Sequence, residues 1–207
     1  GRQEFLYSRV MCWVALDRGI RLAQKRSLPA DLVAWTRSRD EIYHEIHTEF
    51  WSPELGAFVQ SKGSTCLDAS CLLMPLVRFI SPTDPRWLST LDAVGRELVD
   101  DMLVYRYRVG AAADDGLDGE EGTFTMCSFW YVECLSRSGD LLLARHFMDK
   151  MLGYSNHVGL YGGELARRSQ QLGNFPQAFT HLALINAVLH VIATENDTES
   201  ALDESAD

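Results

Sequence analysis

Apolar residues recur every three or four positions along most of the chain, which is the spacing of amphipathic helices. Three of the predicted helices, 66–80, 123–137 and 176–194, are apolar on nearly every face, which indicates burial on all sides. The others keep a polar face, as expected for an outer layer around a buried inner one. No strand-like alternation extends beyond a few residues, so the pattern predicts an all-α fold. The seven predicted helices cover residues 6–26, 30–49, 66–80, 86–103, 123–137, 139–152 and 176–194.

Two long segments without helical spacing, 104–122 and 153–173, separate the later helices. Loops of that length inside a compact domain are usually functional or disordered. The chain also ends on a run of acids that contains no basic residue. This composition predicts a disordered acidic tail over 195–207, after a folded part over 1–194. The acids of the tail are Glu195, Asp197, Glu199, Asp203, Glu204 and Asp207.

Of the 207 residues, 46% are apolar and 23% are charged, and the formal net charge is −10. The apolar fraction is sufficient for a packed core and excludes a disordered chain. The acidic balance argues against a nucleic-acid partner, because no basic surface is available to neutralise phosphates. No apolar run approaches the roughly 20 residues that span a bilayer, so no membrane partner is expected.

The five cysteines are odd in number and include no Cys-x-x-Cys pair, which predicts free thiols in a reducing, cytoplasmic compartment. The first residues, Gly1 to Phe5, contain neither an initiator methionine nor the apolar core of a signal peptide. We therefore expect the chain to begin inside a longer parent.

The best candidates for chemistry are carboxylates on the two long loops. Paired carboxylates beside aromatic side chains suit a sugar site, although acids are also common on ordinary surface loops. Ser128 and His181 make a poor nucleophile and base, because Ser128 falls within a helix without the sharp turn that such a serine needs. The Glu41-x-x-His44 pair lacks the second copy and further glutamates of a di-iron site, so we expect a solvated outer face there. The loop acids are Asp114, Asp115, Asp118, Glu120, Glu121 and Glu164.

Four motifs follow one another along the chain. The first reads Phe5-x-Tyr-Ser-x-Val-Met-x-Trp-Val-Ala-Leu-Asp-Arg18, and the second joins Gly56-Ala-Phe-x-Gln60 to Leu67-Asp-Ala-Ser70. The third reads Asp115-Gly-Leu-x-Gly-x-Glu-Gly-Thr-Phe124, followed by Cys127-Ser-Phe-Trp130, and the fourth joins Gly159-Leu-Tyr161 to Leu172-Gly-Asn-Phe-Pro-Gln-Ala-Phe-Thr-His181. Together they resemble glycoside hydrolase family 15, which contains glucoamylases, glucodextranases and bacterial trehalases, over residues 1 to about 194.

The resemblance implies part of an (α/α)6 barrel, about seven of its twelve helices, and hydrolysis of α-glucosides with inversion. In this chemistry one carboxyl group protonates the leaving oxygen and another activates a water on the opposite face, without metal or cofactor. The family's general acid lies in a Trp-Glu segment just before the first motif, which this sequence does not contain. The general base is the first of two adjacent glutamates after Gly-Leu-Tyr. Here that position is Gly163, and Glu164 takes the base role only if the register slips by one residue.

On the substrate side, the resemblance places an arginine that binds the non-reducing glucose at Arg106. Glu120, Glu121 and Tyr161 are expected to line the same pocket. The expected partner is an oligosaccharide or disaccharide of α-linked glucose, and glucoamylase, trehalase and glucodextranase activities all stay open. We expect this chain alone to be inactive, and a noncatalytic helical protein that binds sugar or a partner is the alternative.

A partial barrel also predicts an exposed apolar edge. The inner helices 66–80 and 123–137 are expected to lie along that edge, where apolar surface favours self-association.

Overall fold

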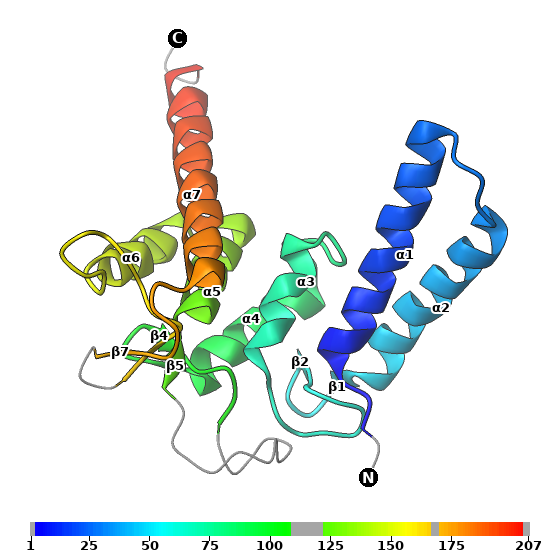
Figure 1. Cartoon of the computed structure of the whole chain (residues 1–207), viewed down its shortest axis with the longest axis horizontal. Coiled ribbons are helices and arrows are strands. Elements are labelled where there is room, and N and C mark those ends of the chain that lie inside the picture. Colours follow the sequence, from blue (N-terminus) through cyan, green and yellow to red (C-terminus); the bar gives the residue numbers. More distant parts are fainter. Residues whose placement is uncertain (1–2, 109–121, 167–169, 205–207) are drawn as a thin grey trace. The chain divides into compact units, whose positions relative to one another are not determined.

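The computed structural model describes residues 3–108, 122–166 and 170–204, and of residues 201–204 only the backbone. The chain divides into two compact units, Gly1–Ala93 and Val94–Asp207, each of which is described by itself. The described residues contain seven α-helices and only short two-residue strands, which confirms the predicted all-α class (Figure 1).

The first unit begins with a helical hairpin of α1 (Leu6–Arg26) and α2 (Leu32–Glu49), close to the predicted 6–26 and 30–49. The turn between them has two standard helix ends. Ser27 ends α1 in the left-handed conformation at φ 51°, and the Asp31 carboxylate accepts the Ala34 N–H at 3.0 Å at the start of α2. Buried apolar side chains then lie on the inner faces of both helices, among them Val10, Trp13, Ile20 and Ile46.

The predicted helix over 66–80 is instead a buried but mostly irregular segment. It contains a 3-10 turn, η1 (Ala69–Leu72), and one short helix, α3 (Leu73–Leu76). Pro75 has no N–H to continue a helix, and Arg78 adopts a positive φ of 63°. The predicted burial is correct, because Leu72 and Met74 are fully buried. A hairpin of β1 (Trp51–Ser52) and β2 (Ala57–Phe58) precedes this segment.

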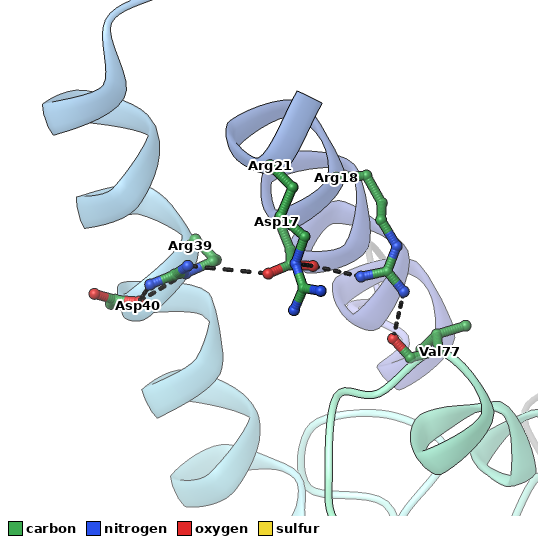
Figure 2. A network of polar contacts seen from close by, with 6 residues as sticks. All are labelled: Asp17, Arg18, Arg21, Arg39, Asp40 and Val77. Atoms are coloured by element: carbon green, nitrogen blue, oxygen red, sulfur yellow. Dashed lines mark hydrogen bonds and ion pairs between the residues drawn. The ribbon is translucent and has the colours of Figure 1, made fainter. Parts of the chain in front are cut away.

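Asp17 on α1 is the centre of a polar network in the first unit (Figure 2). Only 4% of this residue is exposed, and its carboxylate pairs with Arg18 and, at 2.9 Å, with Arg21. Arg39 of α2 lies 4.0 Å from the same carboxylate. Arg18 also donates to the Val77 carbonyl at 2.7 Å. The network therefore connects α1 to α2 and to the residue that follows α3.

Helix α4 (Pro85–Glu97) ends six residues earlier than the predicted 86–103. The remainder forms a hairpin of β3 (Val99–Asp100) and β4 (Leu103–Val104). Its two-residue turn requires positive φ at both central positions, and Asp101 and Met102 adopt φ values of 48° and 65°.

The second unit is built around α5 (Thr125–Ser138), which contacts both α6 (Leu141–Leu152) and α7 (Ala178–Glu204) (Figure 1). Gly139 ends α5 at φ 99°, and the Asp140 carboxylate starts α6 by accepting the Leu143 N–H at 3.1 Å. Most of α5 is buried, including the fully buried Phe129. The prediction that helix 123–137 lies along an exposed edge is therefore wrong, and so is the same prediction for 66–80.

Helix α7 extends to Glu204, so residues 195–204 are helical instead of a disordered tail. Glu195 pairs with Arg145 of α6 at 2.7 Å, which attaches the start of the acidic segment to its neighbour. The Thr198 and Ser200 hydroxyls donate to carbonyls one turn back, which satisfies both hydroxyls within the helix.

One face of α7 is apolar and exposed. Five of its side chains have exposed fractions of 47–68%, namely Phe179, Leu182, Ile185, Leu189 and Ile192. In the described part of the chain one helix, Ala178–Ser200, is long and apolar enough to cross a membrane. That is weak evidence by length and composition only, because core helices of soluble proteins pass the same test.

Candidate functional site

A small three-stranded sheet joins the described ends of the two long loops. Its strands are β5 (Thr123–Phe124), β6 (Glu164–Leu165) and β7 (Gln171–Leu172), in the order β5-β6-β7 and all antiparallel. Phe124 pairs with Glu164, and Glu164 pairs with Leu172. The sheet therefore brings the end of the third motif beside the fourth, as convergence of the two loops requires.

Residues 161–163, just before β6, have all six of their backbone N–H and C=O groups in hydrogen bonds of 2.5–3.3 Å. Five of the six partners are backbone or side-chain groups between Gln171 and His181, so the start of α7 and the segment before it hold this stretch. The position of residue 163 is thus fixed by backbone contacts that need no side chain there. The partners are His181 Nε2 and the Gln177 amide for Tyr161, Gln171 Oε1 and Thr180 Oγ1 for Gly162, and the Asn174 carbonyl and Thr125 amide for Gly163.

The two adjacent glycines of this segment differ in their surroundings. A Cβ atom at Gly162 would lie 2.9 Å from both Gln171 Oε1 and the Leu172 carbonyl oxygen, closer than a carbon atom can approach. A Cβ atom at Gly163 would lie 3.7 Å from Gln177 Nε2 and 3.9 Å from the Asn174 nitrogen, which is ordinary van der Waals contact. Gly162 is therefore required by packing, whereas the structure leaves room for a side chain at position 163.

Glu164 lies at the centre of the small sheet. Its Oε2 atom accepts the Gly122 N–H at 3.2 Å, and the residue is half-buried. A Cβ atom at Gly173 would lie 4.0 Å from Glu164 Oε1. The carboxylate therefore lies close to the backbone of two glycines, one from each long loop.

Tyr161 is placed in the core, with an exposed fraction of 1%. Its ring meets Phe129 of α5 edge-on, with centroids 5.5 Å apart, and its hydroxyl donates to the Leu152 carbonyl at 3.4 Å. Burial raises the pKa of the Tyr161 hydroxyl above its ordinary value. The Tyr161 side chain therefore attaches residues 161–163 to the core of the second unit.

Of the other predicted substrate residues, Arg106 lies in the part of the chain that the structure describes. Arg106 is exposed and its guanidinium lies 5.4 Å from the ring centre of Tyr107. Glu120 and Glu121 lie outside the described residues, as do Asp114, Asp115 and Asp118. Within 3–108, 122–166 and 170–204, no group of three or more histidines, cysteines and acids is arranged to hold a metal ion.

Sequence reasoning missed the side chains that hold residues 161–163. His181 was considered only as a catalytic base with Ser128, but the Ser128 hydroxyl accepts the Val104 N–H at 3.0 Å inside the core. The His181 ring instead accepts the Tyr161 N–H at Nε2, and its Nδ1 lies 2.7 Å from the Gln177 carbonyl oxygen. The available signal was the fourth motif itself, which contains Gln177, Thr180 and His181.

Comparison with known proteins identifies relatives over nearly the whole chain. The model of glycosyl hydrolases family 15 matches residues 1–142. A trehalase of Mycobacterium tuberculosis is 48% identical over 200 residues, which are 96% of this chain and 29% of that protein. A trehalase of Thermoplasma acidophilum is 40% identical over 185 residues, or 88% of this chain and 31% of that protein. The chain thus spans about a third of the length of these relatives.

Solved structures that resemble the chain include glycosidases. One of them, a variant in complex with glucose, superposes with a TM-score of 0.76 at 19% identity, covering 91% of this chain and 52% of that chain. The wild-type glycosidase gives a TM-score of 0.74 at 18% identity. These likenesses support the fold alone, and they agree with the expected part of an (α/α)6 barrel.

Proposed function

The chain belongs to glycosyl hydrolases family 15, and from this premise we propose that it provides the general-base side of an inverting glycosidase site for trehalose. The observation that carries the proposal is the 48% identity to a trehalase across 96% of the chain. The arrangement of residues 161–163 supports it, because a base position has to be held rigidly.

The proposed reaction needs two carboxyl groups on opposite faces of the sugar. The general acid protonates the glycosidic oxygen, while the general base removes a proton from the attacking water, with the two groups about 6.5–9.5 Å apart. No residue of this sequence matches the Trp-Glu segment of the family's acid, and the base position is Gly163. We therefore expect this chain alone to hydrolyse no glycoside.

The test uses a hybrid protein, in which the part of the M. tuberculosis trehalase that precedes the matched 200 residues is joined to Gly1. Glucose release from trehalose and from maltose is measured for the 207-residue chain, for the hybrid, and for the hybrid with Gly163→Glu. The proposal predicts release from trehalose only, and at a measurable rate only with Gly163→Glu. Hydrolysis by the 207-residue chain would contradict its expected inactivity, and a preference for maltose would contradict the substrate.

Gly163 itself favours a second candidate, a noncatalytic helical protein that binds sugar. That candidate predicts binding of trehalose to the 207-residue chain, measured by calorimetry, together with a hybrid that stays inactive even with Gly163→Glu. The two proposals therefore differ in the activity of a single variant.

A further inference from the structure

We infer that Glu164 is a positioning residue, whose carboxylate holds the residue before β5 against β6, and that it does not act as the general base. The inference rests on the proposed function, since it concerns the same site. It replaces the idea that a one-residue slip brings Glu164 into the base position.

The contact with Gly122 carries this inference. Glu164 Oε2 accepts the Gly122 N–H at 3.2 Å, on the residue that precedes β5. A Cβ atom at Gly122 would lie 2.9 Å from the Leu165 carbonyl oxygen and 3.2 Å from Oε2, so this close approach requires glycine. Thr123 adds a second contact, because its hydroxyl donates to the Leu165 carbonyl at 3.1 Å. The start of β5 is therefore attached to β6 by side chains from both strands.

The register of the sheet opposes a slip. Glu164 is paired on both sides, with Phe124 in β5 and with Leu172 in β7. A shift of one residue would reverse the faces of every side chain in β6 and would break both sets of pairs. It would also break the six hydrogen bonds of residues 161–163, which fix the segment immediately before the strand.

Gly163 lies in a bend just before β6, and Glu164 is the first residue of the strand. The Cβ direction at Gly163 leads toward Gln177 and Asn174, whereas the Glu164 carboxylate reaches Gly122. A carboxylate that holds an N–H group needs only an acceptor oxygen, which a glutamine also provides. A general base needs a group that can take a proton, which a glutamine does not provide. Glu164→Gln therefore separates the two roles.

The first measurement is amide hydrogen exchange at Gly122 by NMR on the 207-residue chain, for the native sequence, Glu164→Gln and Glu164→Ala. We expect exchange at Gly122 to be about tenfold faster in Glu164→Ala, and within about threefold of native in Glu164→Gln. The Phe129 amide in α5 is the control, and its exchange should not change. Unchanged Gly122 exchange in Glu164→Ala would overturn the inference.

The second measurement uses the hybrid that carries Gly163→Glu. Adding Glu164→Gln should leave kcat within about fivefold, whereas Glu164→Ala should lower kcat/KM about tenfold. A loss of 10²-fold or more in kcat with Glu164→Gln would show that Glu164 takes the proton and would overturn the inference. If no hybrid hydrolyses trehalose, the proposed function fails, while Gly122 exchange still decides the role of Glu164.

Discussion

Alanine at Gly162 and at Gly163 should have opposite effects on stability, although the two residues are adjacent. The substitution at Gly162 places a methyl group 2.9 Å from the Leu172 carbonyl oxygen, which belongs to the backbone of β7 and cannot rotate away. The same methyl group meets Gln171 Oε1, the acceptor of the Gly162 N–H at 2.5 Å. Either β7 shifts or this hydrogen bond lengthens.

The magnitudes follow from these contacts. Inserting a methyl group into a packed site typically costs about 1–3 kcal/mol, which is the expected loss for Gly162→Ala. At Gly163 the new methyl group has its nearest neighbour at 3.7 Å, and the φ angle is not in the left-handed region. Gly163→Ala should therefore stabilise the fold by about 0.4–1 kcal/mol, because alanine restricts the unfolded chain. The two variants should differ by about 1.4–4 kcal/mol.

The assay is urea unfolding followed by the indole N–H signal of Trp130 in the NMR spectrum. Trp130 is the single tryptophan of residues 94–207, so its signal reports the second unit. The expected order of midpoints is Gly163→Ala above native and native above Gly162→Ala. Equal midpoints for the two variants, or a lower midpoint for Gly163→Ala, would refute the claim that position 163 has room for a side chain.

Three further predictions concern the second unit. Gly95→Ala places its Cβ 2.6 Å from the buried Tyr131 hydroxyl, so it should lower the free energy of unfolding by about 1–3 kcal/mol, measured by thermal unfolding. In a Tyr131→Phe background the same substitution should instead raise the free energy of unfolding by about 0.5–1 kcal/mol. Additive effects of the two substitutions would contradict this prediction. Burial lowers the pKa of His190, whose Nδ1 lies 3.0 Å from the Ser136 hydroxyl. Because the unfolded state then binds more protons, stability should fall as the pH drops below about 6.5, and less so in His190→Gln; an unchanged pH slope would count against it. Met102 adopts a φ of 65°, which glycine adopts without strain, so Met102→Gly should raise the free energy of unfolding by about 1 kcal/mol and with it the unfolding midpoint. A lower midpoint would show that the contacts of the Met102 side chain stabilise the fold by more than the strain costs.

Much of the fold follows from apolar spacing. The two helices of the first hairpin and α5 and α6 begin and end within about two residues of their predicted bounds, because each has both a periodic face and a clear end signal. The segment 66–80 does not form the predicted helix, because continuous apolar character indicates burial but does not distinguish a helix from an irregular buried segment. Pro75 was the signal against a long helix there.

The acidic end of the chain differs from its prediction over the residues that the structure describes. Charge alone predicts disorder over 195–207, but residues 195–204 are helical, since glutamate and alanine are good helix formers and Glu195 pairs with Arg145. Local composition therefore gave less information than the helix that the segment continues. The exposed face of α7 was missed for a related reason, since apolar character on all faces was interpreted as burial.

The candidate site could be located from sequence only through the motifs. They placed the base position at Gly163, but the contacts that hold it come from Thr125 and from residues 171–181, and that convergence depends on tertiary structure. The difference between Gly162 and Gly163 is likewise invisible in a pair of identical letters. It depends on which backbone atoms lie within 4 Å.

The central claim is that hydrogen bonds hold position 163 where the general base belongs, and that this position lacks only a carboxylate side chain. It is tested most directly by the initial rate of trehalose hydrolysis in the hybrid protein with Gly163→Glu, compared with Gly163→Gln as a control of equal size. We predict that Gly163→Glu is faster by about 10²–10⁴-fold, the usual contribution of a positioned general base. Equal rates for the two variants, with both proteins folded, would contradict the claim.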